Sequence, residues 1–243
     1  MKLGNLLLGT AILLGIIFLS GLGMWQVQRL AWKQALIARV ETNLSAAPLE
    51  LQQVLAMQSS GQDIEYRPVR ISGTFQHSLE QHYFATYKGS PGYFVYTPMT
   101  LADARVLFVN RGFVPLDRKA TVGRAEGQIT GIVAIDGLAR TAPAQKPNRF
   151  VPENDLDKNI YHWKSLDQMN RQAFGSDGPA VVPIFVDAGP ASNPGGLPIG
   201  GVTRITFPNS HLQYALTWFG LAGALLVVGG YFLFGRIRSN SAL

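Results

Sequence analysis

The stretch Leu3–Met24, LGNLLLGTAILLGIIFLSGLGM, contains no Asp, Glu, Lys or Arg. A second uncharged stretch, Tyr214–Phe234, YALTWFGLAGALLVVGGYFLF, lies near the other end of the chain. As helices with a rise of 1.5 Å per residue they would reach about 33 Å and 32 Å, enough to cross the hydrocarbon core of a bilayer. We therefore predict two transmembrane helices, residues 3–24 and 211–234, that flank a domain of residues 25–210 and leave residues 235–243 as a tail.

The first apolar stretch could instead be a secretory signal peptide, because Lys2 precedes it and residues 21–23 weakly resemble a cleavage site. We favour an uncleaved span, since the stretch is longer than a typical signal peptide core and Trp25 follows it as an interfacial anchor. Lys and Arg flank the spans on both sides and do not decide the orientation. The amino terminus resembles an export signal, so we expect an inner-membrane protein with both termini in the cytoplasm and the central domain outside it.

Small residues at four-residue spacing occur in both predicted spans. Ala11 and Gly15 form one such pair, and Gly220 and Ala224 form another. Small residues let helix backbones approach closely in a membrane. We therefore predict that the two spans pack on each other through these pairs.

Composition excludes several classes of protein. Of the 243 residues, 47% are hydrophobic and only 15% are charged, which argues against a soluble or a disordered chain. No third apolar stretch of spanning length exists, so the chain is not a polytopic transporter. The absence of cysteine excludes thiol catalysis, Cys-ligated metals and disulfides. The net charge of +6 comes without a basic stripe, and we expect no nucleic-acid partner.

The central domain is predicted to be β-rich. The first helix should continue past the membrane to Pro48, and a short helix is expected over residues 49–57. Alternation of apolar and polar residues predicts a strand at Val69–Phe75. Ser165 and Gly175 mark the start and end of one further helix. Turn residues separate the other expected strands, which favours a mainly antiparallel, α+β, barrel-like domain; these strands are residues 93–97, 105–110, 128–138, 181–187 and 201–207.

Two histidines, His77 and His82, lie close together between expected strands. They could bind a metal weakly, but no third ligand has suitable spacing. We therefore interpret this segment as a solvated loop.

His211 lies in a different setting, in the first turn of the second span and at the edge of the membrane. Tyr214, Ala215 and Trp218 follow it at spacings of three, four and seven residues, which places them near it on the helix surface. A flat apolar ring could lie over Ala215 with His211 at its centre and Trp218 beside it.

The first span supplies two more candidate residues at the same boundary. Trp25 could pack against such a ring, and Arg29 could pair with a carboxylate on it. Together with His211, Tyr214 and Trp218 these residues describe a haem site at the membrane surface. On residue types alone, an aromatic belt that holds two helices at depth is the simpler interpretation.

An enzymatic function has little support. The chain has no G-x-S-x-G elbow, no P-loop and no G-x-G-x-x-G after a strand. No nucleophile is paired with an oriented base. We therefore expect a protein that does not turn over a substrate, and a haem-modifying or lipid-modifying enzyme is the weakest alternative.

Six short motifs occur in order along most of the chain, in residues 23–33, 66–75, 92–98, 109–115, 159–169 and 208–219. Together they resemble one known family, the surfeit-locus-one (Surf-one, or Shy-one) assembly factors of cytochrome c oxidase. Phe113 stands where the family usually has Trp, and Ser210 stands where Asn is common.

The resemblance implies a role in building the haem–copper oxidase. It implies that haem a is bound, with His211 as an iron ligand, and is placed in the large subunit of the oxidase. It also favours the haem site over the aromatic belt. The expected partners are that large subunit, the lipid bilayer and, as a further candidate, haem a synthase. The alternative is a cofactor-free membrane scaffold that stabilises an oxidase assembly intermediate through loops at residues 66–68 and 110–112.

Overall fold

The protein is described by a computed structural model that covers residues 3–203, 205 and 207–240. The chain divides into two compact units. Residues 1–39 and 206–243 form the helical unit, and residues 40–205 form the barrel unit.

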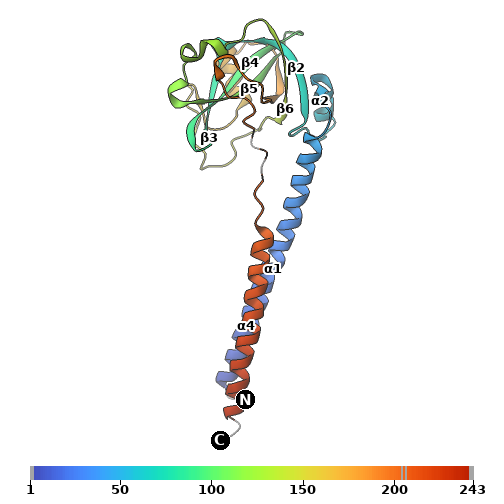
Figure 1. The fold of residues 1–243 in the computed structure, drawn as a ribbon, viewed down its shortest axis with the longest axis vertical. Coiled ribbons are helices and arrows are strands. Elements are labelled where there is room, and N and C mark those ends of the chain that lie inside the picture. Colours follow the sequence, from blue (N-terminus) through green and yellow to red (C-terminus); the bar gives the residue numbers. More distant parts are fainter. Residues whose placement is uncertain (1–2, 204, 206, 241–243) are drawn as a thin grey trace. The chain divides into compact units, whose positions relative to one another are not determined.

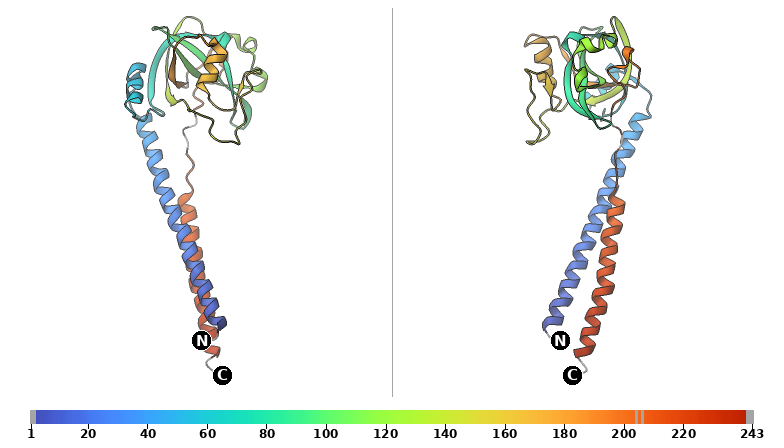
Figure 2. Two further views of the ribbon diagram at one scale, coloured as in Figure 1. Left: turned by 180° about the vertical axis from the view of Figure 1, so that it is seen from behind. Right: turned by 60° about the vertical axis from the view of Figure 1, so that its left-hand side comes forward.

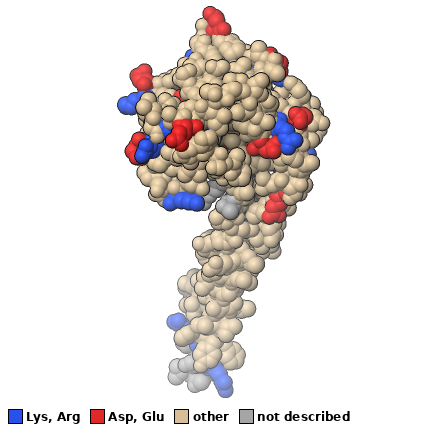
Figure 3. Space-filling view, turned by 45° about the horizontal axis from the view of Figure 1, so that its top comes forward, with Lys and Arg blue, Asp and Glu red and all other residues tan. Residues whose placement is uncertain are grey.

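Two long antiparallel helices make up the helical unit (Figure 1). They are α1 (Leu3–Leu44), whose last residues belong to the barrel unit, and α4 (His211–Asn240). Both helices are long and apolar enough to cross a membrane. On the face shown in Figure 3, these helices carry little charge along their length, whereas charged side chains are spread over the barrel unit. The fold is thus that of a two-pass membrane protein, as predicted.

The two helices meet along a stripe of buried or half-buried residues in which spacings of four and three alternate, except that Gly229 and Leu233 are four apart. This is the spacing of a coiled-coil seam, in which each helix keeps one face toward the other. On α4 the stripe comprises His211, Ala215, Trp218, Ala222, Leu225, Gly229 and Leu233. On α1 it comprises Asn5, Gly9, Ile12, Ile16, Leu19, Gly23 and Gln26, and the same half-buried face continues past the start of α4 as Leu30 and Lys33.

Of the four small residues predicted to form the contact, only Gly15 faces the other helix, and Ala11 is exposed. A side chain added at Gly15 would lie 2.8 Å from Leu225, so this glycine does face α4. Gly220 has no neighbour within 4 Å of such a side chain, and Ala224 is exposed. The small residues that face α1 are Ala215, Ala222 and Gly229, which recur every seven residues. The heptad stripe therefore decides the contact, and the pair of small residues four apart lies outside it.

Five strands close into a barrel in the second unit (Figures 1 and 2). Hydrogen bonds run around the ring from β2 to β6, β8, β5 and β4 and back to β2, and only the β5–β8 pair is parallel. The predicted barrel-like, mainly antiparallel domain is confirmed. The ring strands are β2 (Pro68–Phe75), β4 (Ser90–Leu101), β5 (Val106–Pro115), β6 (Ile132–Thr141) and β8 (Val181–Ala188).

Three short strands and two helices complete the barrel unit. Strand β3 (Gln81–Tyr87) extends the sheet beyond β4, β7 (Ile160–Tyr161) pairs with β3, and β1 (Leu49–Glu50) pairs with β2. The helices are α2 (Leu51–Ser59) and α3 (Leu166–Phe174). As predicted, Ser165 caps α3 by accepting a hydrogen bond from the Gln168 backbone, and Gly175 ends it with a positive φ of 76°.

Strand β5 is buried on both faces, which explains its long apolar run. Leu107 and Val109 belong to the core that also contains α2, whereas Val106 and Phe108 pack with Met169 of α3. Successive side chains of a strand point to opposite faces. Helix α3 therefore covers the outer face of the sheet, while the other face fills the interior.

Three sequence predictions need correction in this unit. Residues 81–87, expected partly as loop, form β3 and bury His82, because Gln81 and His82 take core positions in place of apolar residues. Residues 128–131 are not strand, and β6 begins at Ile132. In the expected strand 201–207, residues 204 and 206 lie outside the described residues, and the others are irregular.

Candidate functional site

All five residues predicted to form a haem site lie in the helical unit. His211 is the first residue of α4, and its backbone N–H donates to Asn209 Oδ1 at 3.3 Å. The imidazole Nδ1 lies 2.7 Å from Oε1 of Gln26 on α1. An amide oxygen only accepts hydrogen bonds, so Nδ1 is the donor in this contact, and in the neutral form of the ring the lone pair is then on Nε2.

The face of α4 on which we expected a flat ring is covered. Ala215 is only 2% exposed, because it lies in the stripe that packs against α1. A porphyrin cannot lie over Ala215 in this arrangement, and that part of the prediction is wrong. Trp218 shares this stripe and is half-buried, whereas Tyr214 is 52% exposed on the neighbouring face.

Trp25 and Arg29 lie on an exposed face of α1. The Arg29 guanidinium lies 5.8 Å from the ring centre of Trp25 and 5.3 Å from that of Trp32. The three residues follow each other at spacings of four and three, so cation–π contacts form between successive helical turns. Arg29 is thus held among indole rings at the surface, and the direct hydrogen bond from α1 to His211 comes from Gln26, which the sequence prediction missed.

The donor chemistry of His211 fits an iron ligand. A histidine that binds a metal is neutral and usually donates its other ring N–H to a fixed acceptor. His211 is half-buried, its Nδ1 already has that acceptor, and Nε2 keeps its lone pair. The exposed guanidinium of Arg29 likewise fits a carboxylate partner such as a haem propionate.

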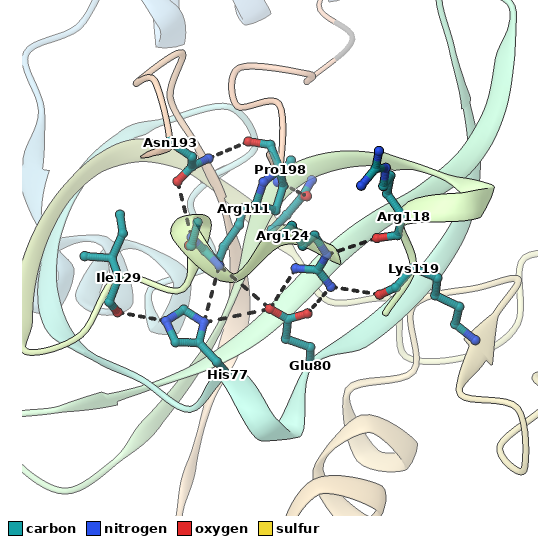
Figure 4. Close-up of polar contacts among 12 residues, drawn as sticks. His77, Glu80, Arg111, Arg118, Lys119, Arg124, Ile129, Asn193 and Pro198 are labelled. Carbon is teal, nitrogen blue, oxygen red and sulfur yellow. Dashed lines mark hydrogen bonds and ion pairs between the residues drawn. The ribbon is translucent and has the colours of Figure 1, made fainter. Parts of the chain in front are cut away.

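A second group of functional side chains lies in the barrel unit, and Figure 4 shows it. Glu80 follows the short helix η1 (His77–Leu79), Arg111 is the extra residue of a β-bulge in β5, and Arg124 lies in η3 (Thr121–Gly127). Their side chains are at most 2% exposed. Arg124 donates to both carboxylate oxygens of Glu80, at 3.1 Å and 2.5 Å, and Arg111 Nη1 lies 3.7 Å from Oε1. We call these three residues the Glu80 cluster.

Backbone and side-chain oxygens complete the cluster. Arg124 donates to the carbonyl oxygens of Arg118 and Lys119, at 3.1 Å and 3.0 Å. Arg111 donates to the carbonyl of Gly127 at 2.5 Å and to Asn193 Oδ1 at 3.2 Å. Through these hydrogen bonds, the two guanidinium groups hold several loops together at one place in the barrel unit.

Glu80 and Arg111 are both charged near neutral pH. Burial alone would raise the pKa of Glu80, but the polar side chains of His77 and Arg124 and the positive charge of Arg111 lower it to about 2. Burial lowers the pKa of Arg111 to about 10, although the negative charge of Glu80 acts to raise it. Neither group exchanges protons at neutral pH, so the cluster is a structural device and not an acid–base site.

The cluster corrects two sequence predictions. Residues 110–112, predicted as a docking loop, lie within β5, where Asn110 and Arg111 are 4% and 3% exposed and unavailable to a partner. His77 Nε2 donates to the carbonyl oxygen of Ile129 at 2.8 Å, so the ring is bound to the protein and not solvated. Within the described residues, no three His, Asp or Glu side chains are grouped to hold a metal ion. An arginine inside an apolar strand was the sequence signal for the cluster.

Comparison with known proteins agrees with the motifs found in the sequence. The model of the SURF1 family matches residues 13–223. Surfeit locus protein 1 of Rattus norvegicus is 38% identical over 220 residues, which cover 84% of this chain and 68% of the relative. The protein of the same name from Homo sapiens is 38% identical over 221 residues, 84% of this chain and 70% of the relative. A SURF1-like protein of Monosiga brevicollis is 35% identical, with 86% of this chain and 80% of the relative covered.

The chain therefore belongs to the SURF1 family, and the resemblance predicted from its motifs is confirmed.

Proposed function

We propose that this protein is an assembly factor for haem–copper cytochrome oxidase that binds haem a in its helical unit and helps insert it into the large oxidase subunit. Membership of the SURF1 family implies a role in cytochrome oxidase assembly. One observation supports the cofactor part of the proposal. His211 lies at the start of an apolar helix with Nδ1 hydrogen-bonded and the Nε2 lone pair left for a metal.

The other predicted residues have separate roles in this proposal. Haem a would be the cargo, and His211 Nε2 would bind its iron. Trp25, Tyr214 and Trp218 supply aromatic surface for the apolar ring, and Arg29 holds a propionate. Haem a synthase is a further proposed partner. The chain's own residues bind and orient the cargo, and no catalytic step is assigned to them.

The ligand assignment is tested with the full-length protein co-expressed with the enzymes of haem a biosynthesis. The purified protein should show the Soret band of bound haem, and His211→Ala should lose or shift it. His162→Ala in the barrel unit is the matched control and should keep the wild-type spectrum. An unchanged spectrum in His211→Ala would show that another group binds the iron.

The role of Arg29 is tested separately. Replacing Arg29 with Ala should weaken haem retention by about 1–3 kcal/mol, the contribution of a hydrogen bond to a charged group. Arg29→Lys keeps the charge and should recover part of the loss. If haem occupancy is the same in Arg29→Ala and wild type, Arg29 does not contact the haem.

A second candidate function is a membrane scaffold that holds an oxidase assembly intermediate without a cofactor. The burial of Ala215 against α1 favours it, because the face of α4 on which a ring was expected is covered. A colourless protein that still co-purifies with oxidase subunits would support the scaffold and contradict haem binding.

A further inference from the structure

Gln26 is a polar residue in the stripe through which α1 packs on α4. It is 8% exposed, and the positions on either side of it on the same face are Gly23 and Leu30. Burying an amide between apolar helices is unfavourable unless the amide is hydrogen-bonded. The contact of its Oε1 with Nδ1 of His211, at 2.7 Å, satisfies that need.

The neighbouring contacts fix the place of Gln26. A side chain added at Gly23 would lie 2.7 Å to 2.9 Å from the ring of Phe219, so the two helices approach closely one turn before Gln26. The close contact at Gly23 therefore limits the rotation of α1 about its own axis at this level. The Gln26 side chain is directed at the first turn of α4, where His211 begins the helix.

We propose that Gln26 is a positioning residue for His211: by accepting the Nδ1 proton, it holds the imidazole in the tautomer whose Nε2 can bind a metal. This inference rests on the proposed function, in which His211 binds the haem iron. In known metal sites, the partner of the non-binding ring nitrogen sets the tautomer and the ring orientation and raises the basicity of the ligand. Gln26 occupies that partner position.

A purely structural role would have different consequences. A buried polar residue in a helix seam can fix the register of the two helices without affecting any ligand. In that case the loss of Gln26 would change the stability of the helix pair but not the affinity for haem. The two roles are separated by measurements on the imidazole itself and on the bound iron.

The first experiment measures the tautomer of His211 in the haem-free, full-length protein. Protein labelled with ¹⁵N-histidine is placed in lipid nanodiscs, and the His211 signals are assigned with the His211→Ala variant. Nδ1 should be protonated in wild type and in the control Gln28→Leu, which changes an exposed glutamine two residues away. Gln26→Leu should lose this preference, and Gln26→Glu, which keeps an acceptor oxygen, should retain it. A wild-type ring protonated at Nε2, or an unchanged tautomer in Gln26→Leu, would overturn the proposal.

The second experiment measures haem a bound during co-expression. Gln26→Leu should lower the affinity for haem by about 10-fold to 100-fold, as is typical when the partner of a metal-binding histidine is lost. Gln26→Glu should keep the haem and lower the reduction potential of the iron, because a carboxylate is the stronger acceptor. If Gln26→Leu no longer protonates His211 at Nδ1 but still binds haem with wild-type affinity, the positioning role of Gln26 is overturned, while His211 can remain the iron ligand. An unchanged spectrum in His211→Ala would instead overturn the ligand assignment of the proposed function.

Discussion

Glu80 shows how a single residue can organise a barrel of mostly apolar strands. Its carboxylate is buried together with two guanidinium groups, and each of these donates to carbonyl oxygens of nearby loops. Burying charges away from water costs desolvation free energy. The attraction within the ion pairs offsets that cost only when the remaining polar atoms are also hydrogen-bonded. The cluster therefore holds the loops in one arrangement, and its stability depends on all three charges being present.

Replacing Arg124 with Met should destabilise the barrel unit by about 3–5 kcal/mol, because it leaves the buried Glu80 with its closest cation removed. Urea unfolding of the full-length protein, followed by near-ultraviolet circular dichroism, measures this loss. Arg70→Met is the control, since Arg70 and Asp136 form an exposed pair with side chains 56% and 62% exposed. Arg70→Met should lower the free energy of unfolding by less than about 1 kcal/mol. Equal losses in the two variants would contradict the structural role of the cluster.

His82 should make the stability of the barrel unit depend on pH. Burial lowers the pKa of His82 to about 4, from an ordinary value of 6.5. Above pH 6.5 the imidazole is neutral in both the folded and the unfolded chain. As the pH falls from 6.5 toward 4, only the unfolded chain gains the proton, so the folded state loses stability, by at most about 1.4 kcal/mol per pH unit.

His82→Phe should flatten this part of the profile, measured by urea unfolding at a series of pH values. Glu80 also has a lowered pKa of about 2, so it causes a second loss of folding stability. That loss begins only as the pH falls below about 4.5, the ordinary pKa of a glutamate. His162→Phe is the control, because it replaces a half-buried histidine elsewhere in the barrel unit by the same residue. A slope that persists in His82→Phe would show that another group is responsible.

Sequence reasoning at the residue scale identified His211 but not its partner. The break at Pro208 and the apolar run that follows placed His211 in the first turn of a span, and local signals of this kind are readable from sequence. Gln26 is 185 residues away in the chain, and only the packing of the two helices brings them together. The same holds for the Glu80 cluster, where Arg124 is 44 residues from the carboxylate.

At the scale of elements, the predictions succeeded where hydrophobic periodicity was strong. The long first helix, β2, β8 and the capped helix α3 follow directly from spacing and end signals. Strand β3 was missed because it buries Gln81 and His82, which carry no apolar signal. The contact face of α4 was misjudged because small residues occur on more than one of its faces, and the partner helix selects among them.

The register of the two helices can be tested by cross-linking, which the absence of native cysteine makes specific. A Cβ added at Gly229 would lie 3.0 Å from the Cγ2 and Cδ1 atoms of Ile12, so the two positions face each other across the helix pair. The double variant Ile12→Cys/Gly229→Cys should therefore oxidise readily in lipid, as detected by mass spectrometry of the digested protein. Ile12→Cys/Gly230→Cys is the control, because Gly230 has no neighbour within 4 Å. Equal cross-linking of both pairs, or of the control alone, would contradict the heptad stripe.

At the scale of the whole molecule, two helices that can cross a membrane bracket a single barrel domain. If both helices cross the membrane, the residues before α1 and after α4 lie on one side of it and the barrel unit lies on the other. Basic residues do not choose between the two orientations, since Lys2, Arg236 and Arg238 at the ends are matched by Arg29, Lys33 and Arg39 after the first span. The export-like amino terminus favours a barrel outside the cytoplasm, where the proposed delivery of haem a would take place.

Single cysteines in the cysteine-free chain test this orientation. Val122 is 89% exposed on the barrel unit, and Ser239 lies beyond the last arginine of the chain. In intact spheroplasts, a membrane-impermeant maleimide should label Val122→Cys, because the barrel faces the outer solution. It should label Ser239→Cys only after the membrane is permeabilised. The opposite pattern would place the barrel in the cytoplasm, and labelling of both sites in intact spheroplasts would show that only one of the two helices spans the membrane.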